Sequence, residues 1–188
     1  TRLVSDWSSD VCSSDLRQLR IAMWSFAVVA VISIVALFLQ STFFRLMLPD
    51  SAVIPNLMVT VVAFLAFHSP NPLGLALSFF LGLCLDLGSA VLVGPWAGAF
   101  VVVFLLLSSV TQRIFVDSPL TAFVAVLCAA LLAQGVFIAL SMQFRAFEFE
   151  FGALVSQVSL EALFSAFCAP LCFAGLRRLR IVPPQRVV

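Results

Sequence analysis

The chain has 188 residues, of which 63% are hydrophobic and only 10% are charged, and its formal net charge is +1. Its mean hydropathy of +1.18 excludes a water-soluble globular domain, because a core of this size cannot bury so much apolar surface. The composition therefore predicts an all-α, polytopic membrane protein, in which the position of each charge matters more than the sum.

Residues 1–16 differ in composition from the rest of the chain. The segment SDWSSDVCSSDL, Ser5 to Leu16, is rich in Ser and Asp and has no hydrophobic periodicity. It resembles the in-frame translation of a sequencing adapter, and a disordered acidic tail is the alternative. We set residues 1–16 aside as an artefactual or disordered leader.

The first predicted membrane span covers residues 21–39, because 19 apolar residues reach roughly the 30 Å of a bilayer core. A loop is expected from Gln40 to Asp50. A second, shorter span is predicted at residues 51–67, with Pro55 in its first turn, where the missing N–H group costs nothing. The two prolines of the Ser69-Pro-Asn-Pro72 turn end this span.

Four further spans are predicted, followed by a basic tail. The spans lie at about residues 73–91, 95–113, 120–142 and 152–176, and the tail at residues 177–188. The expected architecture is one transmembrane domain, residues 17–176, built as a bundle of about six helices. The apolar connection at residues 88–94 is the exception to this simple pattern, since it also fits a re-entrant bend.

The arginines predict the orientation in the membrane. With a cytoplasmic N-terminus, seven arginines lie on the inner side, and only Arg45 and Arg145 lie on the outer side. Both termini are therefore expected in the cytoplasm. The outer loop at residues 144–151 alternates Phe with polar residues and is expected to lie at the interface, where Phe147 and Phe149 are candidates for contact with a partner.

Small and polar residues recur every four positions within the third span. Gly74, Ser78, Gly82 and Asp86 form one stripe, which predicts close approach of a neighbouring helix. A carboxylate in hydrocarbon costs at least about 2.5 kcal/mol, so Asp86 is expected to face protein. Two roles for Asp86 stay open: capping the third loop or the start of the fourth span, and binding a partner or solute.

A second set of polar residues lies in the last two spans. Gln157, Glu161 and Ser165 share one face of the sixth span, and Gln134 lies in the middle of the fifth. Hydrogen bonding between helices is a sufficient explanation for Gln134 and Ser165. For Glu161, a proton-coupled or substrate-binding carboxylate is an alternative, and the sequence leaves open whether these residues meet Asp86.

Other reactive residues carry weak signals. His68, the single histidine, stands beside the Ser-Pro turn and is predicted to be a solvated loop residue, and the intramembrane cysteines read as small core side chains. The spacing of Gly94 and Gly98 is explained better by a turn than by helix dimerisation. No nucleophile motif, metalloprotease motif or phosphate loop is present. We therefore expect no enzymatic activity, no cofactor and no metal.

Residues 54–98 resemble the MreD family of rod shape-determining membrane proteins of bacteria. The resemblance is carried by Pro55-Asn56-Leu57, Pro72, Gly74, Phe79 or Phe80, Gly82 and Asp86-Leu87. The chain length, Pro170 and the arginine-rich tail fit the same family. Asn56 departs from the pattern, because an Asp is often found there, and the third loop lacks the usual turn.

The resemblance implies a non-enzymatic, multi-pass component of the bacterial inner membrane that takes part in cell elongation. Its partners would be MreC and, through it, MreB, RodA and the elongation transpeptidase, with no nucleic acid and no small-molecule substrate. The alternative is a solute-binding subunit similar to those of energy-coupling-factor vitamin transporters, whose fold is also a six-helix bundle. Such a protein needs a polar pocket, for which Asp86, Gln134 and Glu161 are the available residues.

Overall fold

The computed structural model describes residues 23–43, 46, 54–69, 71–89, 94–111, 119–143 and 151–178. Within these ranges the backbone is helical apart from short connections, and no strand occurs. The all-α prediction is therefore confirmed for this part of the chain. The leader at residues 1–16, most of the basic tail, and the loop residues Phe147 and Phe149 lie outside the described ranges.

Six helices follow one another along the described part of the chain. They are an N-terminal helix, Met23–Thr42, whose end is the π-helix η1, Leu39–Phe43; α3, Leu57–His68; α4, Pro72–Ser89; α5, Pro95–Thr111; α6, Pro119–Gln143; and α7, Phe151–Arg178. Proline occupies the first position of α4, α5 and α6, where its fixed φ angle suits a helix and its missing N–H group has no partner to lose.

Three of these helices are long and apolar enough to cross a membrane: Met23–Thr42, α6, and the Val155–Arg178 part of α7. The helices α3, α4 and α5 are apolar but shorter. The 12 residues of α3 extend only about 18 Å, against a hydrocarbon core of about 30 Å. The described chain is thus a helix bundle of membrane-protein character, and the arrangement with six crossings stays a prediction.

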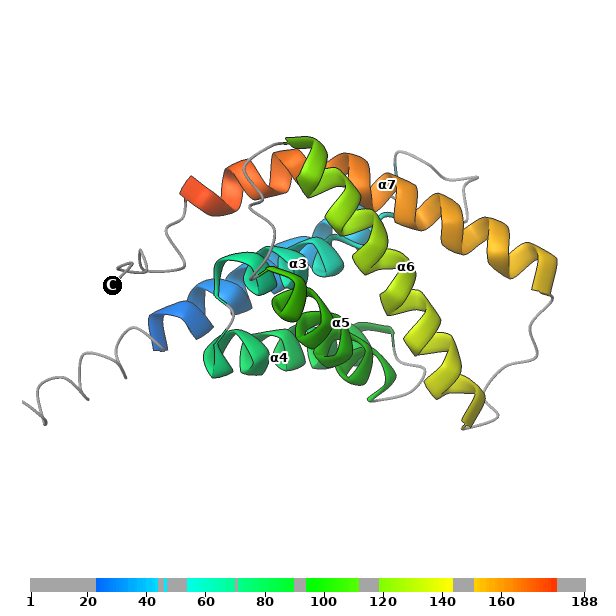
Figure 1. The fold of residues 1–188 in the computed structure, drawn as a ribbon, viewed down its shortest axis with the longest axis horizontal. Coiled ribbons are helices and arrows are strands. Elements are labelled where there is room, and N and C mark those ends of the chain that lie inside the picture. Colours follow the sequence, from blue (N-terminus) through cyan, green and yellow to red (C-terminus); the bar gives the residue numbers. More distant parts are fainter. Residues whose placement is uncertain are drawn as a thin grey trace, which may run out of the picture.

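Helix α3 forms the centre of the bundle (Figure 1), where it contacts α4, α5, α6 and α7. Ten of its twelve residues, Leu57 to Ala66, are buried. A helix that is apolar on every side is stable only when other elements surround it, which explains this central position. Because α3 has no polar face, its sequence alone does not tell which neighbour lies on which side.

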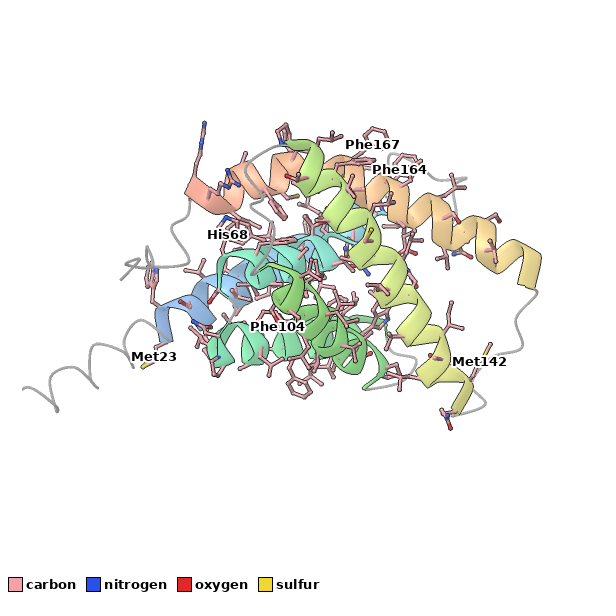
Figure 2. All side chains as sticks on the ribbon, in the orientation of Figure 1. Met23, His68, Phe104, Met142, Phe164 and Phe167 are labelled. Atoms are coloured by element: carbon pink, nitrogen blue, oxygen red, sulfur yellow. The ribbon has the colours of Figure 1, made fainter. Side chains whose placement is uncertain are left out.

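The long helices, in contrast, carry large apolar side chains on the outside of the bundle. In each of the three long helices, only 28% of the most apolar 18-residue stretch is buried. In Figure 2, Phe164 and Phe167 point away from the bundle along α7, and Phe167 is 67% exposed. Such surfaces are unfavourable in water and match the acyl chains of a lipid bilayer.

The structure corrects the expected start of the second span. Helix α3 begins at Leu57, so Pro55 lies before the helix and not in its first turn. The reason is Asn56, whose extended backbone and side-chain oxygen cap the helix by accepting a hydrogen bond from the Val59 N–H at 3.4 Å. The loop expected from Gln40 also begins later, because η1 continues the N-terminal helix to Phe43.

The turn between α3 and α4 also corrects the expectation for His68. Asn71 Oδ1 accepts hydrogen bonds from the Gly74 N–H at 2.9 Å and the Ser69 hydroxyl at 3.0 Å, which caps α4. His68 is the last residue of α3, and its ring stacks on Phe64 with the centroids 4.1 Å apart. It is half-buried among aromatic rings and is not a solvated loop residue.

Candidate functional site

Asp86 joins the end of α4 to the beginning of α5. Its Oδ2 accepts hydrogen bonds from the Gly94 N–H at 2.9 Å and the Ala97 N–H at 3.1 Å, and its Oδ1 accepts one from the Trp96 N–H at 3.1 Å. The first N–H groups of a helix have no partner inside the helix, and a carboxylate there also complements the helix dipole. The sequence leaves two roles open for Asp86, capping and ligand or partner binding. These contacts are those of a residue that caps the start of α5.

The small residues of the α4 stripe lie against α5. A Cβ atom added to Gly82 would stand 2.5 Å from Ala97 Cα and 2.7 Å from both Ala97 N and the Trp96 carbonyl oxygen. A Cβ atom on Gly74 would collide with the Ser69 carbonyl oxygen. The expected close approach of a neighbouring helix is therefore confirmed at Gly82, and that neighbour is α5.

The connection into α5 requires a glycine. Gly94 has a φ angle of +123°, a conformation that L-amino acids with side chains rarely adopt. Its carbonyl oxygen accepts the Gly98 N–H at 2.9 Å, and its own N–H donates to Asp86. Turn geometry thus accounts for Gly94, whereas Gly98 is explained by packing, because a Cβ atom there would stand 3.0 Å from Leu140 Cδ1 on α6.

The Pro55-Asn56 segment is held between two long helices. Gln40 Nε2, near the end of the N-terminal helix, donates to the Pro55 carbonyl oxygen at 3.2 Å. The Asn56 N–H donates to Ser165 Oγ on α7 at 2.8 Å, and that hydroxyl donates to the Glu161 carbonyl oxygen at 2.8 Å. These bonds satisfy backbone groups of an extended segment, which has no helical hydrogen bonds of its own.

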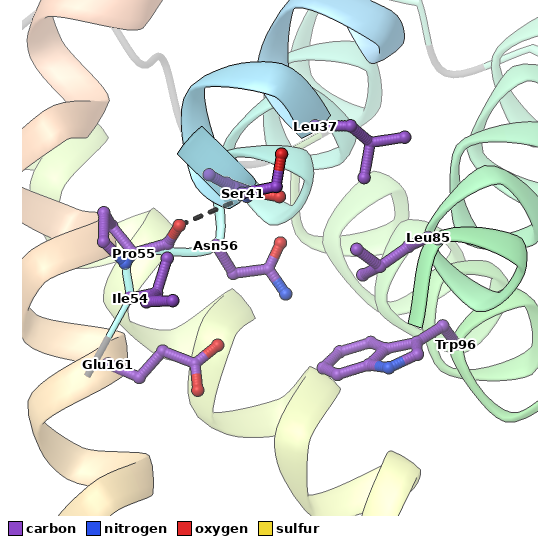
Figure 3. Close-up of a pocket in the computed structure, with 10 residues that line it drawn as sticks. Leu37, Ser41, Ile54, Pro55, Asn56, Leu85, Trp96 and Glu161 are labelled. Carbon is purple, nitrogen blue, oxygen red and sulfur yellow. Dashed lines mark hydrogen bonds between the residues drawn. The ribbon is translucent and has the colours of Figure 1, made fainter. Parts of the chain in front are cut away.

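A pocket of about 410 Å³ opens beside this segment (Figure 3). Five elements meet there: the end of the N-terminal helix, the residues before α3, the end of α4, the start of α5, and α7. The lining residues are Leu37, Gln40, Ser41, Ile54, Pro55, Asn56, Leu85, Gly88, Trp96 and Glu161. Three candidate site residues from the sequence, Pro55, Asn56 and Glu161, are therefore brought together.

Glu161 has a polar partner within the bundle. The Gln134 side chain on α6 forms a hydrogen bond with the Glu161 carboxylate, so these two residues of the expected cluster meet. Asp86 does not line the pocket, and its carboxylate faces the first turn of α5. The convergence left open by the sequence is thus partial: it includes Gln134 and Glu161, with Asn56, but leaves Asp86 outside.

The remaining candidate residues have positions that the fold explains. Pro72 begins α4, and the Ser78 hydroxyl donates to the Gly74 carbonyl oxygen within the same helix at 2.9 Å. The described cysteines are free thiols. Cys84, Cys168 and Cys172 are half-buried, but Cys128 is exposed on α6, so the expectation of a core side chain is wrong for Cys128. Within the described ranges, no three His, Cys, Asp or Glu side chains are grouped closely enough to hold a metal ion.

Sequence reasoning misses several pocket residues. It places Gln40 and Ser41 in a loop, although both belong to η1; two polar residues directly after a long apolar run are a signal of a polar helix end. Trp96 and Gly88 carry no such signal, because their role depends on how α4 and α5 meet. Trp96 stacks on Phe137 of α6 with the centroids 4.4 Å apart, which fixes the indole at the pocket wall.

Comparisons of the chain with models of protein families, with curated proteins and with solved structures found no match.

Proposed function

We propose that this chain is a non-enzymatic membrane component that assembles with partner membrane proteins, in the manner that its resemblance to the MreD family implies. The proposal rests on what the motif residues of α4 contact in the structure. Gly82 and Asp86 both act on the first turn of α5, one through close backbone approach and the other through three hydrogen bonds. These residues build one helix pair, which supports a structural use of the motif.

The outer surface supports the same proposal. Exposed apolar side chains continue along the N-terminal helix, α6 and α7, including Ile34, Leu120 and Leu171. In a bilayer such faces pack equally well against lipid or against the helices of another protein, since association there depends on packing and not on a hydrophobic driving force. The proposed partner is MreC, and the proposed location is the bacterial inner membrane with both termini in the cytoplasm.

The test is co-purification of residues 17–188 with the MreC of the same source genome in mild detergent, followed by native mass spectrometry. We expect a complex of defined stoichiometry. Replacing Gly82 by Leu should separate α4 from α5 and abolish the complex, whereas Leu87→Ala, which alters an exposed side chain of α4 outside the proposed partner faces, should leave it intact. A folded wild-type protein that never retains MreC would contradict the proposal.

A further inference from the structure

The polar side chains that line the pocket are one carboxylate, Glu161, and the neutral groups of Gln40, Ser41 and Asn56. Gln40 uses one of its two amide N–H groups on the Pro55 carbonyl oxygen, and it keeps a second N–H and its side-chain oxygen. Ser41 donates to the Phe38 carbonyl oxygen at 3.4 Å, which leaves the lone pairs of its hydroxyl. Gln40 and Asn56 also carry amide N–H donors, so the group that favours a hydrogen-bond donor on the ligand is the Glu161 carboxylate.

The charge of the pocket points to a cationic ligand. The hydrogen-bond partner of the Glu161 carboxylate is the Gln134 amide, which carries no charge. Among the described residues, no arginine lines the pocket. A carboxylate placed among membrane-type helices without a counter-charge is costly, and a positive group next to it recovers part of that cost. A ligand that brings its own positive charge therefore gains most at this position.

The side of the pocket opposite Glu161 is apolar. Leu37, Leu85 and the indole of Trp96 line it, whereas Ile54 lies beside Pro55 on the side of Glu161 (Figure 3). Figure 3 shows Trp96 and Glu161 on opposite sides of Asn56, with their side chains directed toward the same space. Apolar walls, an aromatic ring and a few polar groups within about 300–1,000 Å³ are typical of small-molecule sites, and aromatic faces also attract organic cations.

We propose that this pocket binds a small amphipathic organic amine, with its ammonium group at the Glu161 carboxylate and its apolar body against Trp96. The proposal replaces the expectation that the chain has no small-molecule ligand, and it is narrower than the solute-binding alternative because it names the ligand class. It is independent of the proposed assembly with MreC.

The experiment uses two probes of nearly equal shape, 2-phenylethylamine and its neutral counterpart 2-phenylethanol. The full chain in lipid nanodiscs is titrated with each, while tryptophan fluorescence is excited at a wavelength that neither probe absorbs. Equilibrium dialysis of the labelled amine provides a second readout. We expect saturable binding of the amine only, with a fluorescence change that is lost in Trp96→Phe.

Two variants test the site itself. Glu161→Gln keeps the shape of the side chain and should raise the Kd of the amine at least tenfold. Gly88→Leu should fill the pocket and abolish binding, while Ser159→Ala, which alters an exposed residue of α7, should bind as wild type does.

Three outcomes overturn the proposal: equal binding of both probes, an unchanged Kd in Glu161→Gln, or no saturable amine binding by a folded protein. If wild type binds no amine and Glu161→Gln releases MreC, the carboxylate serves a protein partner instead. Retention of MreC is measured separately, so the failure of one proposal is distinguishable from the failure of the other.

Discussion

At the scale of single residues, Asp86 is the residue whose removal should cost the most. Its carboxylate satisfies three N–H groups of α5 and the connection before it and is 1% exposed, so Asp86→Ala leaves buried donors without a partner. Hydrogen bonds to a charged group contribute about 1.5–3 kcal/mol each, and lost helix caps about 0.5–2 kcal/mol. We expect Asp86→Ala to lower the free energy of unfolding by at least about 2 kcal/mol.

The loss should appear as a lower melting temperature of the purified protein in detergent. Asp86→Asn should fall between Ala and wild type, because its amide keeps one acceptor oxygen. The neighbouring Leu87 is 65% exposed, and Leu87→Ala is the matched control, with little change expected. A melting temperature of Asp86→Ala equal to that of Leu87→Ala would refute the capping role.

At the scale of elements, the pairing of α4 with α5 depends on the absence of a side chain at Gly82. The atoms that a Cβ would meet, Ala97 Cα, Ala97 N and the Trp96 carbonyl oxygen, belong to the backbone and cannot rotate away. Gly82→Ala must therefore push the two helices apart, which strains the Asp86 cap at their ends. We expect the free energy of unfolding to fall by about 1–3 kcal/mol, as it does for overpacked cores, and the melting temperature to fall clearly with it.

Gly135 offers the opposite case within the same chain. It lies in α6 and is exposed, and nothing stands within 4 Å of the position that a Cβ atom would take there. Gly135→Ala should be neutral or stabilising, because Ala is favoured over Gly in a helix by about 1 kcal/mol. If both glycine variants changed stability in the same direction by the same amount, close packing at Gly82 would be disproved.

The elements also show where sequence reasoning succeeds. The helices α4, α5, α6 and α7 begin and end within a few residues of the predicted spans, because proline and arginine mark their ends. The stripe on α4 is readable because small residues at every fourth position stand out in an apolar helix. The start of α3 is not readable in this way. Asn56 caps the helix within an otherwise apolar stretch, and hydrophobicity alone does not show that the helix begins after it.

The pocket is beyond prediction for a different reason. Gln40, Asn56, Trp96 and Glu161 come from four separate parts of the chain, and only the packing of the helices brings them together. The sequence identifies Glu161 as a residue that apolar surroundings would not tolerate without a partner. It does not indicate that this partner is Gln134, or that Asp86 faces α5 instead.

At the scale of the whole molecule, the pocket constrains how consecutive helices run. It joins the end of the N-terminal helix, the start of α3, the end of α4 and the start of α5. These ends meet at one side of the bundle when each connection reverses the direction of the chain. Three extended residues before α3 add about 10 Å to its length of about 18 Å, so even this short helix nearly spans the hydrocarbon.

The sides of the membrane on which the two termini lie distinguish six crossings from three, because an even number of crossings returns the chain to the side where it began. If all six helices cross, both termini lie on the same side; if only the three long helices cross, the termini lie on opposite sides. The arginines at the end of α7, Arg177 and Arg178, favour the cytoplasm for the C-terminus. We therefore expect full-length fusions in a bacterium to give a fluorescent C-terminal GFP and an inactive C-terminal alkaline phosphatase.

The same fusions at the N-terminus give the reference side, so the result does not depend on an assumed orientation. Equal behaviour of the two termini requires an even number of crossings, and it places the pocket at the outer side of the membrane when both ends are cytoplasmic. Opposite behaviour would exclude six crossings. In that case α3, α4 and α5 would not all span the bilayer, and the route by which an amine reaches Glu161 would have to be sought from either side.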